Sequence, residues 1–375
     1  MFFRHTQRSD APLVAAAVVS ACRIDGWTEE IQPQFLRKIF REFFGYDFDF
    51  FTLEGISVSH FKSQITELNK RSELIDLMLV VEMLCPKIPV KATTLIDIWA
   101  KHLGVKTEGV LLARDLAYSL LSKAQEDFYR NNYFYTLDKL IPNFHALEER
   151  YGIKAIMLTV ESSPTITARY EALGLLDDGT LGRCLWEFYK QRKFLFPGEI
   201  GSVNESVAHH DWIHVLADYD NDGIGEIEVS AFSTMTTDSS SAVVGFLGVL
   251  SIYQGGLLKT ILQGPPHPGH ELEGEIPMNR IADALRRGKE CNIDLIHDNN
   301  IVKDMENVKQ QYIKIMEENK FKFPTETIEL PSRGIVYPEN NPLSHGKIEM
   351  KYMTAREEDI ITNQSYIQKG TVIDK

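Results

Sequence analysis

The stretch HHDWIHVLADYDNDGIGEIE, residues 209–228, predicts two helices joined by a turn, and it sets the fold of the chain around it. Successive residues of an α-helix are separated by about 100°, so His210 and His214 lie roughly 40° apart on one helix face. Asp211 falls within the same arc. This face of the first helix therefore has the geometry of a chelating site.

Glu226 lies twelve residues after His214, too far along one continuous helix to join the histidines. The string DYDNDGIG, residues 218–225, contains helix breakers that allow the chain to turn back. The sequence therefore predicts four residues as divalent-metal ligands and as the catalytic residues, namely His210, Asp211, His214 and Glu226.

Two imidazoles with one or two carboxylates suit zinc best, and iron or manganese as alternatives. If all four residues bind the ion, the site is closed and structural. If Asp211 only supports a ligand, a position stays open for water or substrate. The neighbouring His209 is a competing ligand, and the simplest alternative is a metal-free, solvated helix face.

Read from Asp218, the same stretch begins like an EF-hand calcium loop, with Asp220 and Asp222 at the third and fifth positions. The twelfth position, which supplies a bidentate glutamate in such loops, is Val229. A loop without this carboxylate has too few oxygen ligands, so the pattern favours a turn over a calcium site.

Helical periodicity continues on both sides of this stretch, so we predict an all-α fold. An apolar helix is expected at 11–22, followed by an amphipathic helix at 28–44 with Thr28 as its N-cap. Further helices are expected at 59–68, 72–84, 93–105, 109–129, 165–174, 180–194, 206–220, 226–237, 242–253, 276–292 and 304–320.

Residues 131–150 contain aromatic residues and a proline without a clear period, and we place a domain boundary there. The predicted units are a helical bundle at 1–132, a second helical domain at 133–320 and an extended tail at 321–375. The alternating run at 347–353 predicts a short strand in the tail, and Thr354 begins a capping-box pattern that predicts a helix.

Composition excludes several classes of protein. The formal net charge of −13 argues against nucleic acid as a partner. The 4 cysteines are isolated from one another, which fits a reducing cytoplasm. No nucleotide-binding or flavin-binding motif is present, so we predict no organic cofactor site. The opening residues predict no signal peptide, and residues 242–262 are too interrupted by polar and glycine residues for a membrane span.

The spacing His210-Asp211-x-x-His214-x(11)-Glu226 resembles the signature of the COQ4 family of ubiquinone-biosynthesis proteins. The TLG residues at 180–182 and the segment NRIADALRRGKECNIDLI, residues 279–296, are similar to other parts of that family. The likeness covers residues of about 150–315.

This resemblance implies a metal-dependent protein on the inner face of a membrane that binds a prenylated quinone precursor. It also implies replacement of the ring carboxylate at C1 by hydroxyl, and contact with other quinone-biosynthesis enzymes. The apolar segment 242–253 would hold the isoprenoid tail or would simply be core. A lipid-binding scaffold without turnover is the alternative function.

Two further resemblances concern the ends of the chain. The segment VSACRIDGWTEE, residues 19–30, resembles the acidic helix turn of the TerB-like fold, although the second such turn has only Glu82 nearby. The residues from Leu330 to Lys375 resemble the N-terminal segment of a T4-type phage baseplate protein family. This second likeness implies a third hypothesis, a virion protein that contacts baseplate proteins through its tail.

Overall fold

The protein, seen in a computed structural model, is mostly helical, as predicted. The structure describes residues 3–138, 143–260, 267–297, 325–329 and 347–351. The helices before residue 139 are η1 (Arg8–Asp10), α1 (Ala11–Cys22), α2 (Ile31–Phe44), α3 (Val58–Gln64), α4 (Leu68–Met83), α5 (Val90–Leu103), α6 (Gly109–Ala117), α7 (Leu121–Asn131) and α8 (Tyr133–Asp138). Those after residue 142 are α9 (Phe144–Tyr151), α10 (Lys154–Met157), α11 (Pro164–Ala172), η2 (Leu173–Leu175), α12 (Leu181–Arg192), α13 (Glu205–Ala217), α14 (Gly223–Thr236), α15 (Ser240–Tyr253) and α16 (Glu275–Glu290).

The predicted helices are found, with local corrections. The segment predicted as one helix at 109–129 is two helices, because Ser119 adopts a left-handed conformation with φ of 58° between α6 and α7. Thr28 does not cap α2, which begins at Ile31. Instead, the Gln32 side chain accepts hydrogen bonds from the amides of Thr28 and Glu29, both at 3.1 Å. The helix predicted at 304–320 lies outside the described residues.

Residues 131–150, expected to be a boundary without helical period, contain α8 and α9. The side-chain oxygen of Asn132 starts α8 by accepting a hydrogen bond from the amide of Phe134 at 2.8 Å. Both helices are too short to produce a recognisable hydrophobic period.

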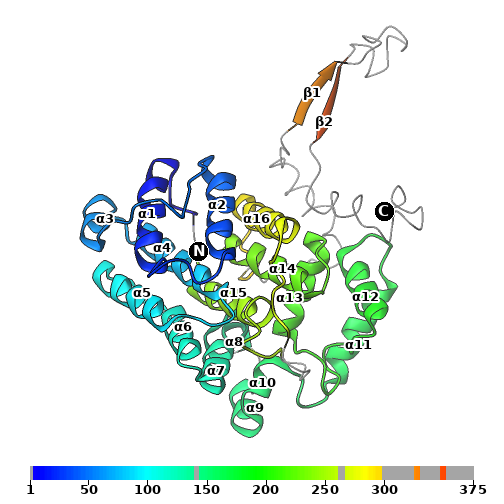
Figure 1. The fold of residues 1–375 in the computed structure, drawn as a ribbon. Helices are drawn as coiled ribbons and strands as arrows, with labels where there is room; N and C mark the ends of the chain where they lie inside the picture. The colour runs from blue at the N-terminus through cyan, green and yellow to red at the C-terminus, as the bar shows by residue number, and fades with distance from the viewer. Residues whose placement is uncertain (1–2, 139–142, 261–266, 298–324, 330–346, 352–375) are drawn as a thin grey trace. The chain divides into compact units, whose positions relative to one another are not determined.

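Helix α15 packs against both predicted domains. Figure 1 shows it in the middle of the helical unit, where it contacts α14 and also α4, α6 and α7. Helix α16 likewise packs against α2 as well as α14. The described helices form one compact unit, so the structure does not confirm a division near residue 132. The physical reason is that α15 is apolar on all sides and must be covered on all sides.

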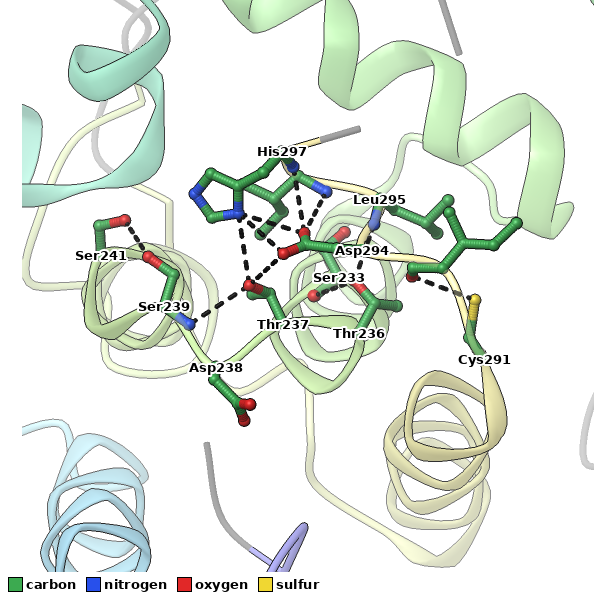
Figure 2. Close-up of polar contacts among 12 residues, drawn as sticks. Ser233, Thr236, Thr237, Asp238, Ser239, Ser241, Cys291, Asp294, Leu295 and His297 are labelled. Atoms are coloured by element: carbon green, nitrogen blue, oxygen red, sulfur yellow. Dashed lines mark hydrogen bonds and ion pairs between the residues drawn. The ribbon is translucent and has the colours of Figure 1, made fainter. Parts of the chain in front are cut away.

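The chain after α16 folds back against the C-terminal end of α14. The Thr237 hydroxyl donates to Asp294 Oδ2 at 2.8 Å, and His297 Nδ1 lies 3.0 Å from the same oxygen (Figure 2). The Asp294 carboxylate therefore binds both neighbours. Thr237 Oγ1 also lies 3.4 Å from His297 Nδ1, so the three side chains form one polar cluster.

A second compact unit contains the strands β1 (Thr325–Glu329) and β2 (Lys347–Lys351), which pair antiparallel with Ile328 opposite Ile348. Strand β2 confirms the strand expected from the alternating run. The helix predicted from Thr354 lies outside the described residues. No helix in the described part of the chain is long and apolar enough to cross a membrane.

Substitution of Gly248 is expected to destabilise the helical unit. An added Cβ would lie 2.1 Å from the Phe128 ring, which α7 packs directly on α15. We expect Gly248→Ala to lower the free energy of unfolding by about 2 kcal/mol, within the range for overpacked cores. The control is Gly245→Ala, whose Cβ would meet the Tyr133 ring at 3.4 Å. Urea denaturation measures both variants, and equal stability of the two would contradict this packing.

Candidate metal centre

The turn between α13 and α14 is built from the residues that resemble a calcium loop. Asp218 ends α13 in a left-handed conformation, with φ of 61°. Asp222 caps α14, because its side chain accepts a hydrogen bond from the Gly225 amide at 2.8 Å. A Cβ at Gly225 would lie 1.8 Å from the carbonyl oxygen of Asp220, so this position requires glycine. The loop residues serve the turn, as the sequence indicated.

This turn brings Glu226, in the first turn of α14, beside two histidines of α13. His210 Nε2 lies 2.9 Å from Glu226 Oε2, and His214 Nε2 lies 3.5 Å from Glu226 Oε1. The two Nε2 atoms are 3.0 Å apart. Donor atoms around a tetrahedral zinc ion are separated by roughly 3.3 Å. The three side chains therefore fit a divalent ion with only small adjustments.

The orientation of His214 is fixed by its other ring nitrogen. His214 Nδ1 lies 3.2 Å from the carbonyl oxygen of Tyr219, which can only accept, so Nδ1 carries the proton. Nε2 then faces Glu226 and His210, where it donates to the carboxylate when protonated and presents its lone pair to an ion when deprotonated. Such a hydrogen bond to the remote nitrogen is the usual support of a metal-binding histidine.

The charge of the Glu226 carboxylate also suits a cation at this position. Burial opposes ionisation of Glu226, yet His214 and His210 together lower the pKa of its carboxyl well below the usual range. Burial also disfavours the charged form of His214, but the Glu226 carboxylate raises the pKa of this imidazole above its ordinary value. Glu226 is therefore ionised and available as an oxygen donor.

Asp211, predicted as a fourth ligand, is not part of this group. Its carboxylate accepts a hydrogen bond from the Tyr189 hydroxyl on α12. Burial raises the pKa of Asp211, with His210 and the Tyr189 hydrogen bond acting in the opposite direction. The structure thus brings together three of the four predicted residues. It places the fourth beside them, facing α12.

His209 is buried and lies outside the group that could hold a metal. Burial and repulsion by His210 lower the pKa of His209 to about 4, so the ring is neutral. Within the described residues its Nδ1 has no hydrogen-bond partner. His209 therefore does not compete with His210 as a ligand in this conformation, although it is the residue directly before the motif.

The acidic residues of the segment 19–30 and Glu82 do not form a metal group within the described chain. Asp25 is exposed and pairs with Lys91 at 3.1 Å, and Glu29 is exposed as well. Glu82 is instead completely buried in α4, where burial raises the pKa of its carboxyl to about 8.

A cavity of about 370 Å³ opens beside the metal-binding group. His210, Asp211 and Glu226 form one part of its wall. The rest is mainly aromatic and aliphatic, contributed by Phe128, Tyr129, Tyr133, Phe134, Met157, Phe194, Leu195, Val249, Ile252 and Tyr253. The volume falls within the usual range for small-molecule sites, which are mostly apolar with a few polar groups.

The apolar segment 242–253 belongs both to the cavity wall and to the core. Gly245, Val249 and Ile252 of α15 line the cavity, while the opposite side of the helix is packed in the core. The aromatic residues of α7 and α8 were not predicted as site residues. Their only signal was the aromatic composition of 131–150, because no motif connects them to the histidines.

Comparison of the chain with protein-family models, curated proteins and solved structures found no match.

Proposed function

We propose that this protein binds a divalent metal and a prenylated aromatic acid, and that it acts on the ring of a quinone precursor. The observation that supports this function most directly is that His210 and Glu226, two of the three residues that could hold an ion, line a largely apolar cavity. Three protein donors leave coordination positions for another molecule. Zinc is the first candidate for the ion, with iron and manganese as alternatives.

The residues of the chain divide the work between the two ends of such a ligand. The wall formed by α7, α8 and α15 would cover an isoprenoid tail, and each buried CH₂ group contributes about 0.8 kcal/mol. His210, His214 and Glu226 would hold the ion, which acts as a Lewis acid on the ring carboxylate when bound. Asp211 stays beside this region with its carboxylate hydrogen-bonded by Tyr189.

The cavity mouth supports a proposed peripheral contact with a membrane. Lys193, Phe194 and Leu195 line the mouth, and all three are exposed. Ile200, next to the lining residue Gly201, is 66% exposed. Apolar side chains beside a cation are the combination that binds the boundary between lipid headgroups and acyl chains. Entry of a lipid from this side would avoid its passage through water.

The test is native mass spectrometry with elemental analysis of the full chain. We expect close to one metal ion per chain and a co-purifying prenyl lipid. Protein loaded with iron(II), the redox-active alternative to zinc, is then supplied with 3-geranyl-4-hydroxybenzoate, dioxygen and a two-electron reductant. In the expected reaction, carbon dioxide leaves, one oxygen atom enters the ring and the other becomes water. Metal and lipid without turnover would identify the alternative, a lipid-binding scaffold for quinone-biosynthesis enzymes. A folded protein that binds neither would refute both functions.

A further inference from the structure

Tyr133 stands out among the residues that surround the cavity. It begins α8 and is only 4% exposed, yet it lines the cavity together with His210 and Glu226. In the part of the chain that the structure describes, no hydrogen bond reaches its hydroxyl group. The Tyr133 hydroxyl is not one of the fully buried unpaired atoms of the described residues, so it borders the cavity and is available to a molecule bound there.

The ring of Tyr133 is held firmly in place. On one side it packs against α15 at Gly245, where an added Cβ would be in van der Waals contact with the ring at 3.4 Å. The Phe134 ring packs beside it with a centroid distance of 4.2 Å, and Phe134 also makes an edge contact with His210. Asn132 caps the helix that carries both aromatic residues. The hydroxyl position is therefore set by packing.

Tyr133 lines the same cavity as the carboxylates of Glu226 and Asp211. Burial raises the pKa of Tyr133 first, and the carboxylates of Glu226 and Asp211 raise it further. The group stays protonated at neutral pH and can donate a hydrogen bond. Among the other tyrosines of the cavity wall, Tyr189 donates to Asp211, while the Tyr253 ring makes an edge contact with His267.

We propose that the Tyr133 hydroxyl donates a hydrogen bond to an oxygen atom of the ligand that binds beside His210, His214 and Glu226. This assignment rests on the proposed metal site and adds a residue that recognises the polar end of the ligand. A carboxylate or phenolate oxygen is the group that such a donor fits, because hydrogen bonds to charged acceptors are the stronger ones.

The experiment uses the full chain loaded with cobalt(II), with benzoate as the probe and visible absorption of the ion as the readout. Tyr133→Phe keeps the ring and removes only the hydroxyl. We expect this variant to bind cobalt as the wild type does, and to bind benzoate roughly 10-fold to 100-fold more weakly, the loss associated with one charged hydrogen bond. Tyr129→Phe, which removes a hydroxyl from the same wall, is expected to bind benzoate normally.

The possible results are distinguishable. Equal benzoate affinity of wild type and Tyr133→Phe would overturn the assignment, as would a cobalt-loaded wild type that does not bind benzoate. An equal loss in the Tyr129→Phe variant would also overturn it, because the effect would then belong to the cavity wall in general. A wild type that takes up no cobalt would instead refute the proposed metal site itself.

Discussion

Replacement of His214 by alanine is expected to weaken zinc binding at least about 100-fold. His214 supplies one of three converging donor atoms, and its orientation is fixed by the Tyr219 carbonyl. Loss of a residue that only supports a metal ligand typically costs 10-fold to 100-fold in affinity, and loss of the ligand itself should cost at least as much. Competition with a chromophoric chelator measures the affinity of the full-length protein.

His209→Ala is the matched control for this prediction. It removes a histidine of the same helix that is also buried, but that lies outside the metal-binding group. We expect its zinc affinity to remain within about 3-fold of the wild type, well below the 10-fold loss typical of supporting residues. Equal loss in the two variants would indicate that the helix, and not the assigned ligands, determines binding. Zinc binding unchanged in His214→Ala would refute the site.

Glu82→Gln is expected to stabilise the protein by about 3 kcal/mol at pH 7, because the buried carboxyl keeps its proton in the folded state up to about pH 8. Apart from the nearby Cys22 thiol, its oxygens have no polar partner among the described residues. The pKa of Glu82 is raised in the folded state. Below the unfolded-state pKa of about 4.3, the carboxyl is protonated in both states and Glu82 therefore does not lower the folding stability. As pH rises from there to about 8, the unfolded state releases a proton that the folded state retains, and stability falls.

Urea denaturation of wild type and Glu82→Gln between pH 5 and pH 8 tests this account. The difference in unfolding free energy between the two proteins should increase by about 1.4 kcal/mol per pH unit. The exposed residue Glu54 provides a control, since Glu54→Gln should leave the pH profile unchanged. A difference between wild type and Glu82→Gln that does not vary with pH would show that Glu82 titrates as an exposed carboxyl does.

Local sequence patterns determined much of the helical structure. The helix at Ala11–Cys22 was predicted with its observed bounds, because an uninterrupted apolar run of this length between polar residues usually forms a buried helix. The caps of α12 and α14 were not predicted; they are Thr180 and Asp222, each of which accepts a hydrogen bond from an amide three residues later. In contrast, Thr28 resembled a cap but was replaced by the Gln32 side chain.

The metal centre was predictable to the same degree. The spacing of His210 and His214 on one helix, and the turn before Glu226, are properties of neighbouring residues and follow from helix geometry. The orientation of the Asp211 side chain was not predictable, because it depends on a hydrogen bond from Tyr189, which lies on another helix. Its sequence position next to His210 is equally compatible with binding the ion and with facing away from it.

The sequence alone thus determined the helical class, the turn between α13 and α14, and the pairing of two histidines with a returning glutamate. All three depend on interactions between residues close together in the chain. Only the tertiary structure decided that α15 joins the two predicted domains, that its glycines accept the rings of Phe128 and Tyr133, and that an apolar cavity opens beside His210 and Glu226. These features depend on which helices pack against one another, and side-chain packing between segments distant in sequence determines that choice.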